Sequence, residues 1–209
     1  MKTVLVVLTI VFFGVTTSYG GAWGPIGSSS TYNYINDEGE LLEVTYSSNG
    51  NRTSRYHRYW GAVVSETMIE DTLGNVFLTY SGLYHQGAID PDYGYSFDPG
   101  LMVLDFPLSV GEAWAASGVG SGFYEPTCEA EFQFHVVSEL EVSVPAGVFS
   151  VYEVSLVNQS CLDYPQSGSY FLSPEFGPII LPGGFMLLDI NGVVSGEETS
   201  FGGLKALYR

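Results

Sequence analysis

The chain has 209 residues, of which 45% are hydrophobic and 15% aromatic, and its 23 acidic and 6 basic residues give a formal net charge of −17. This apolar content excludes a disordered chain, and the length suits one domain or two small ones. A strongly negative protein repels phosphate backbones and anionic lipid surfaces, which excludes nucleic acid as a partner. Two interpretations of the acidity stay open: a highly soluble surface, as in proteins adapted to salty water, or a surface that collects cations.

Residues 1–20 have the pattern of a secretory signal peptide. Lys2 precedes an apolar run from Val4 to Val15, and Ser18 and Gly20 stand at the −3 and −1 positions of a cleavage site. The run of about a dozen residues is shorter than the ~20 that span a bilayer. We therefore expect an exported protein, periplasmic or extracellular, with no membrane span in its mature chain.

After the signal peptide we expect a flexible lead, residues 21–30, and a single β-rich domain, residues 31–209. No segment keeps a helical period of 3.6 for three turns, whereas period-two alternation recurs between Gly, Asn, Asp and Pro residues. This pattern predicts an all-β domain. We expect a single antiparallel meander sheet of roughly ten to twelve strands, curled into a half-barrel or a barrel.

The first hairpin is predicted around the turn at residues 48–51. Apolar and polar residues alternate from Leu42 to Tyr46, and the chain returns through Arg55–Trp60. Residues 71–75 have the composition of a second turn, which joins a strand at 68–70 to a strand at 76–80.

The return strand of the first hairpin concentrates positive charge, with three arginines and one histidine within residues 52–58. Period-two geometry places Arg55 and His57 on one face of that strand and Arg58 on the other. Arginines interleaved with aromatic residues are typical of surfaces that bind carbohydrates, carboxylates or proteins. The alternative is charge balance with acids on neighbouring strands. The ligand-binding hypothesis names Arg55, Tyr56, His57, Arg58 and Trp60.

The longest stretch without periodicity covers residues 82–100, and it is expected to be a loop that is either functional or disordered. It contains Asp90, Asp92 and Asp98, whose carboxylates are the hard oxygen ligands that calcium prefers. The alternative is that these aspartates are solvated turn formers. Calcium is the one candidate cofactor, and no other is expected.

Alternation is clearest between residues 128 and 157. Phe132, Phe134 and Val136 share one face there, and the other face carries Glu131 and His135, which we expect to be exposed to solvent. A tight reversal is predicted at residues 145–147, Pro-Ala-Gly. Farther along, Asn191-Gly192 carries the strongest two-residue hairpin signal, between a strand at 185–190 and Val193-Val194.

Two cysteines are present, Cys128 and Cys161. Because an exported chain folds in an oxidising compartment, we expect them to form a disulfide.

Three segments together resemble a set of uncharacterised exported β-rich bacterial domains, distantly similar to lipoprotein-carrier half-barrels. They carry the patterns FPLxVGxxW at 106–114, VxVPAGxFxxYxV at 142–154 and YxxxPExG at 170–177. The resemblance implies an antiparallel sheet curled around an apolar inner face, and it implies no reaction. The strand pattern itself places Trp114, Phe149 and Tyr152 in the core.

Catalytic signatures are sparse. The chain has three histidines and neither a GxSxG elbow nor an HExxH motif. Glu129 and Glu131 share one strand face, as do Glu139 and Glu141, and such pairs are compatible with a glycoside hydrolase. Our leading hypothesis is a non-enzymatic binding or envelope-associated module for an apolar or saccharide ligand. The alternatives are a carboxylate-pair hydrolase and a structural or assembly component of the cell surface, whose sheet edges pair with other subunits.

Overall fold

The computed structural model describes residues 30–59, 62–85, 91–122, 127–162 and 164–192, and every regular element in this part of the chain is a β-strand. None of the described residues forms a helix long and apolar enough to cross a membrane. The all-β prediction is confirmed, whereas the predicted signal peptide lies outside the described residues. The twelve strands are β1 (Ser30–Ile35), β2 (Leu41–Asn49), β3 (Arg52–Tyr59), β4 (Ala62–Glu70), β5 (Val76–His85), β6 (Tyr93–Leu104), β7 (Ala113–Gly122), β8 (Thr127–Val144), β9 (Gly147–Asn158), β10 (Gly168–Ser173), β11 (Gly177–Leu181) and β12 (Phe185–Gly192).

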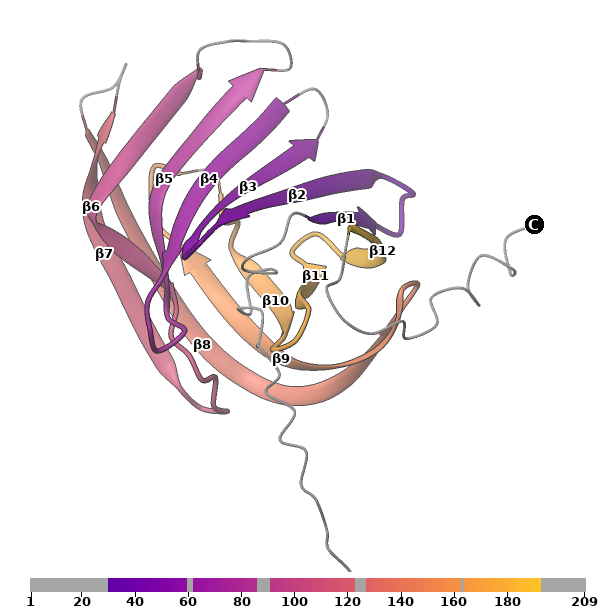
Figure 1. The fold of residues 1–209 in the computed structure, drawn as a ribbon. Coiled ribbons are helices and arrows are strands. Elements are labelled where there is room, and N and C mark those ends of the chain that lie inside the picture. The colour runs from indigo at the N-terminus through magenta and orange to yellow at the C-terminus, as the bar shows by residue number, and fades with distance from the viewer. Residues whose placement is uncertain (1–29, 60–61, 86–90, 123–126, 163, 193–209) are drawn as a thin grey trace, which may run out of the picture.

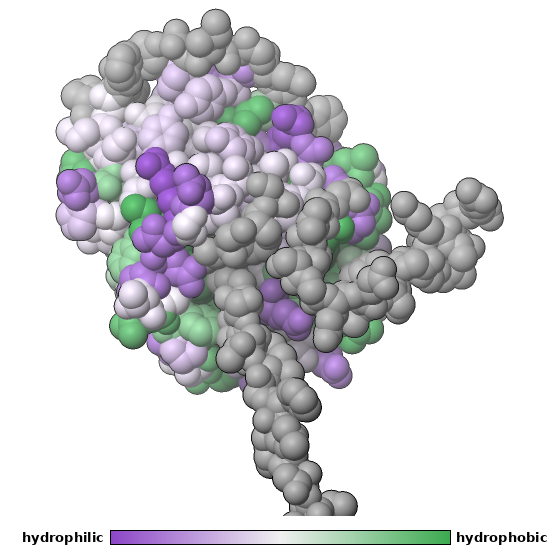
Figure 2. All heavy atoms as spheres, in the orientation of Figure 1, coloured by the Kyte–Doolittle hydropathy of each residue, from purple (hydrophilic) through white to green (hydrophobic). Residues whose placement is uncertain are grey.

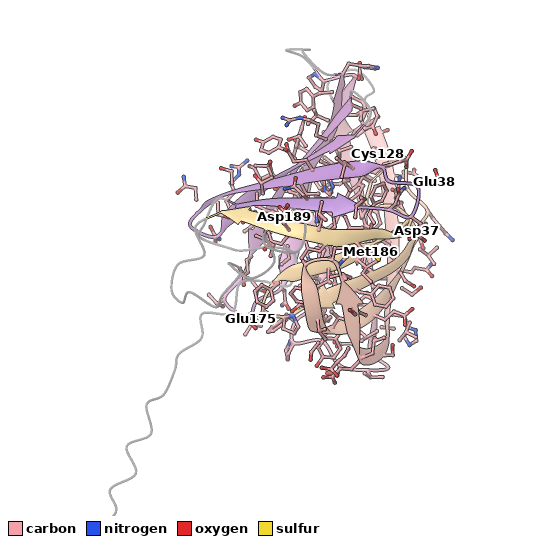
Figure 3. All side chains as sticks on the ribbon, turned by 90° about the vertical axis from the view of Figure 1, so that its right-hand side faces the viewer. Asp37, Glu38, Cys128, Glu175, Met186 and Asp189 are labelled. Atoms are coloured by element: carbon pink, nitrogen blue, oxygen red, sulfur yellow. A yellow bond between two sulfur atoms is a disulfide. The ribbon has the colours of Figure 1, made fainter. Side chains whose placement is uncertain are left out.

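The strands form one antiparallel meander that closes into a barrel (Figure 1). Each strand pairs with its neighbours in the sequence, and β1 closes the circle by pairing with β12. The side chains of Asn33 on β1 and Asp189 on β12 also form a hydrogen bond, at 2.7 Å, across this closure; Figure 3 labels Asp189. Of the two expected forms, the structure is therefore the closed barrel.

Period-two alternation decides which side chains fill the barrel. Along β8, alternate residues from Cys128 to Val136 are buried, and those between them are exposed. Trp114 stacks on Phe134 inside, with ring centroids 4.8 Å apart. Trp114 and Phe149 lie in the core as expected, and Tyr152 is half-buried against it. On the face that Figure 2 shows, apolar side chains are scattered among hydrophilic ones.

The turns at residues 48–51, 71–75 and 145–147 join strands as predicted. The predicted disulfide between Cys128 and Cys161 is also present, with Cα atoms 5.7 Å apart. It fastens the connection between β9 and β10 to the start of β8, and Figure 3 labels Cys128.

The loop predicted at residues 82–100 is wrong. Strand β5 continues to His85 and β6 begins at Tyr93, so most of this stretch is strand. Its glycines conceal the strand pattern because they make room for one side chain. A Cβ atom at either Gly82 or Gly94, which pair with each other, would lie 2.5 Å from the Tyr80 hydroxyl oxygen.

The hairpin turn predicted at Asn191-Gly192 is also wrong. Both residues belong to β12, where Asn191 pairs with Thr31 and Gly192 with Ser30. Closure of the barrel supplies a long-range strand partner at this position, and that partner outweighs the local preference of Asn-Gly for a turn. Val193 and Val194 lie outside the described residues.

Candidate functional site

One row of inward-facing residues crosses six neighbouring strands, each residue paired with the next by strand register. All six are less than one-tenth exposed, although most are polar or charged. The row is Ser30, Tyr46, Arg55, Glu66, Ser81 and Tyr95. A barrel interior lined in this way differs from a purely apolar core, because each buried polar group needs a partner.

Arg55 and Glu66 form a buried ion pair at the centre of the row. The Arg55 Nε and Nη2 atoms lie 2.8 and 2.6 Å from Glu66 Oε2, and the side chains of both residues are at most 2% exposed. The same oxygen accepts a third contact from His57 Nε2, at 3.1 Å. We call Arg55, His57 and Glu66 the interior cluster.

The directions in which the pKa values shift indicate which groups of the interior cluster are charged near neutral pH. Burial alone would raise the pKa of Glu66, but the Arg55 charge and the hydrogen bonds from His57 and Arg55 outweigh it and lower the pKa. Burial would lower the pKa of Arg55, but the charge of Glu66 raises it overall. For His57, burial is the largest influence and lowers the pKa to about 4. Arg55 and Glu66 are therefore charged, and His57 is neutral.

These charges also fix the tautomer of His57. A deprotonated carboxylate only accepts hydrogen bonds, so His57 Nε2 carries the hydrogen that it donates to Glu66. The Nδ1 atom of the neutral ring is then an acceptor. Both His57 Nδ1 and Glu66 Oε1 are buried without a hydrogen-bond partner in the described part of the chain. The cluster thus holds two buried acceptors that lack donors, and the hydroxyl group of Tyr164, whose ring packs on that of His57, is also buried without a partner in the described part of the chain.

The segment between β9 and β10 packs against the cluster. Within it, the Tyr164 ring lies 4.1 Å from the His57 ring, centroid to centroid, and 5.4 Å from Arg55 Cζ. The Asn158 side-chain amide donates to the carbonyl oxygens of Leu162 and Pro165, which shapes the segment, and the disulfide of Cys161 fastens it. An aromatic wall on an ordered segment therefore borders the interior cluster.

The structure divides the five residues of the ligand-binding hypothesis between two faces. Arg55 and His57 point inward, whereas Tyr56 is 40% exposed and Arg58 contacts Glu43 on the outside. Both arginines thus pair with acids on adjacent strands, as the charge-balance alternative predicts. Trp60 lies outside the described residues.

The aspartates considered for calcium are not brought together. Asp92, just before β6, contacts His85, whereas Asp98 lies six residues farther along the chain, within β6. Six extended residues span ~20 Å, far more than one ion bridges. Asp90 is outside the described residues, and the described residues contain no group of three potential metal ligands.

The acidic pairs considered for hydrolysis lie on the outside of β8. Glu129, Glu131, Glu139 and Glu141 are all exposed, and Glu131 accepts a hydrogen bond from Gln133. His135 is exposed as predicted. An open groove of about 470 Å³ runs beside it, lined by Ala113, Trp114, Ala115, Gln133, Phe134, His135, Ser155 and Val157.

Sequence reasoning missed Glu66, Tyr46 and Tyr164 as members of the site. A signal for Glu66 was present: it stands at period two between Val64 and Met68, so it had to share their face. An acid on that apolar face, one strand from an inward arginine, indicates a buried ion pair. Tyr164 gave no such signal, because an irregular segment carries it to the cluster.

No protein-family model, no curated protein and no solved structure matches the chain. Fold and site together define an acidic, closed twelve-stranded barrel with a charged cluster buried inside.

Proposed function

We propose that this protein is an exported, non-enzymatic binding module whose ligand site is the barrel interior at the interior cluster. The observation that carries the proposal is the pair of buried acceptors, His57 Nδ1 and Glu66 Oε1, that lack donors in the described part of the chain. Buried polar atoms are normally satisfied, so this pair needs hydrogen-bond donors beyond those of the described residues, and a bound molecule and ordered water are the two candidates. The disulfide is compatible with export.

The wall of this site supports a binding role. Tyr34, Tyr46 and Tyr170 are all at most 1% exposed, and Tyr164 contacts His57 directly. Barrels commonly bind small ligands within their interior, where aromatic walls provide contact area and a few polar groups set orientation. The ligand classes that we consider are the apolar and saccharide classes expected from the sequence.

Thermal unfolding in the presence of small molecules tests the proposal. The mature chain is titrated with monosaccharides, disaccharides, neutral alcohols and fatty acids, and the melting temperature is recorded. A ligand that binds only the folded state stabilises it, by ~2.7 kcal/mol at one hundred times its Kd. We expect at least one compound to raise the melting temperature.

Two matched variants locate the binding. His57→Asn changes the interior cluster, and His135→Asn makes the same substitution on the exposed face of β8. We expect the ligand-induced shift to disappear in H57N and to persist in H135N. If no compound in the panel binds, or if binding is unchanged in H57N, the proposal is wrong.

A further inference from the structure

We propose that Asn49 is a site of spontaneous deamidation, at which the side-chain amide is converted to the carboxylate of aspartate or isoaspartate. Asn49 is the last residue of β2, and Gly50 follows it in the short turn to β3. An Asn-Gly sequence favours this reaction because glycine has no side chain to hinder attack by its backbone nitrogen. The proposal does not depend on the proposed function above, since it concerns a hairpin turn and not the interior cluster.

The surroundings of Asn49 leave the reacting atoms accessible. Asn49 is exposed, and its side chain makes no hydrogen bond in the described part of the chain. Gly50 has a φ of +64°, and a Cβ atom placed on it would meet nothing within 4 Å, so no side chain packs over the turn at this point. Strand β4 holds the turn one residue farther along, where the carbonyl oxygen of Asn51 accepts a hydrogen bond from the Glu70 backbone nitrogen at 2.9 Å.

The reaction has two steps. The Gly50 backbone nitrogen attacks Asn49 Cγ and gives up its proton, the bond from Cγ to the amide nitrogen breaks, and that nitrogen leaves as ammonia. The product is a cyclic succinimide, in which the Gly50 nitrogen is bonded to two carbonyl carbons. Water then opens the ring. Hydrolysis of the new bond gives aspartate, and hydrolysis of the original peptide bond gives isoaspartate, so water is the one co-reactant and ammonia the one leaving group.

A second Asn-Gly sequence in the chain provides an internal comparison. Asn191 and Gly192 both belong to β12, and both pair with residues of β1. Ring formation at this place requires the peptide unit to rotate out of the sheet, which breaks part of the barrel closure. At Asn49 the same rotation opens only the terminal pair of a hairpin, Asn49 with Arg52. Because local opening costs least at exposed turns and most in paired strands, the folded barrel should protect Asn191 but not Asn49.

The residue opposite Asn49 suits the aspartate product. Asn49 and Arg52 are directly paired in the strand register, so their side chains are neighbours on one face of the hairpin. Arg52 is exposed and forms no ion pair within the described part of the chain. Deamidation to aspartate therefore places a carboxylate opposite a guanidinium. Isoaspartate instead lengthens the backbone by one methylene group and disturbs the pairing.

The experiment follows both Asn-Gly sites in the same protein. The mature protein is incubated at pH 8.5 and 37 °C, and samples are digested at acidic pH and mapped by mass spectrometry. The chain unfolded in guanidinium chloride is the reference, because neither site is protected there. An isoaspartyl methyltransferase, which methylates isoaspartate and not aspartate, detects that product independently. Asn49→Gln is the matched control, since the longer glutamine side chain cyclises far more slowly.

We expect the two sites to react at similar rates in the unfolded chain. In the folded protein Asn191 should react more slowly than Asn49 by about tenfold or more, and N49Q should accept few methyl groups. Asn49→Asp should also raise the melting temperature, and this gain should shrink when Arg52 is replaced by Gln. If Asn49 stays intact in the folded protein, or if both sites react there at equal rates, the proposal is overturned. A gain in N49D that is unchanged by R52Q would overturn the role assigned to Arg52.

Discussion

At the scale of single residues, the carboxylate of Glu66 accepts all of its hydrogen bonds on one oxygen. Oε2 contacts Arg55 twice and His57 once, whereas Oε1 is the buried acceptor that lacks a donor. The carboxylate that compensates the charge of Arg55 is thus also part of the proposed binding site. The proposed function therefore assigns both stability and recognition to the Glu66 side chain.

Glu66→Gln therefore leaves the Arg55 charge buried without its counter-charge. We expect the free energy of unfolding to fall by about 3–5 kcal/mol, as is typical when one partner of a buried pair is removed. Glu43→Gln is the matched control, because Glu43 pairs with Arg58 on the exposed surface, where such pairs contribute about 0–1 kcal/mol. Urea unfolding followed by circular dichroism measures both variants. If E66Q and E43Q lower the free energy of unfolding by similar amounts, the buried Arg55–Glu66 pair contributes no more to stability than the exposed Arg58–Glu43 pair, and the prediction is wrong.

His57 makes stability depend on pH. Its pKa is lowered from 6.5 to about 4 in the folded protein, mainly by burial, so the unfolded chain takes up a proton first as the pH falls. The contribution of His57 is therefore complete above about pH 6.5 and is lost between pH 6.5 and pH 4. The difference in pKa corresponds to about 3 kcal/mol at most.

Unfolding free energies of the wild type, H57N and H135N at pH 7 and pH 4.5 measure this effect. The wild type and H135N should lose stability across this range by about the same amount, whereas H57N should lose much less. Glu66 titrates below its usual range, so its contribution is lost mainly below this window. Equal losses in all three proteins would contradict the assignment to His57.

At the scale of the strands, Tyr80 determines how β5 and β6 pair. Its hydroxyl group contacts that of Tyr84 at 2.9 Å and lies over Gly82 and Gly94, where a Cβ atom would come within 2.5 Å of it. Gly94→Ala should therefore destabilise the protein by about 1–3 kcal/mol through overpacking. Tyr80→Phe removes the clashing oxygen, so G94A should cost less in the Y80F background than in the wild type.

A double-mutant cycle on Tyr80 and Gly94, measured by urea unfolding, tests this coupling. Gly118→Ala is the control, since the Cβ atom there would meet only the terminal Cδ2 atom of Leu101, at the far end of a flexible side chain, and no tyrosine hydroxyl. A cost of G94A that is the same with and without the Tyr80 hydroxyl would refute the role of this contact.

The strands that sequence reasoning predicted well are those whose apolar residues repeat every second position. Residues 128–136 are the clearest case, because one side chain in two must face the core. Prediction failed where a tertiary partner was decisive. Gly82 and Gly94 look like loop residues because the Tyr80 side chain occupies the space that their own side chains would fill. Asn191-Gly192 looks like a turn because the partners of these two residues, Thr31 and Ser30, lie far away at the start of the barrel. For the same reason Tyr164 was not foreseen as a wall of the site.

At the scale of the whole molecule, negative charge dominates, with a net charge of −17. Charges of one sign repel each other more strongly in the compact state, so screening by salt should stabilise the folded protein. We expect the melting temperature to rise as NaCl increases from 10 mM to 500 mM. Choline chloride is the control: an equal rise indicates screening alone, and a larger rise with NaCl indicates a surface that collects small cations. A melting temperature that falls with either salt would contradict the role of self-repulsion.

The pairing of β1 with β12 has a consequence for how the protein is made. Ser30 and Gly192 are adjacent in the finished barrel but far apart in the chain, so the last rows of hydrogen bonds form only after residue 192 has been synthesised. Until then one edge of β1 has no strand partner. Contacts between residues so far apart in the sequence are slow to form. The barrel therefore cannot close before residue 192 is available, which is compatible with the predicted export of a chain that has not yet folded.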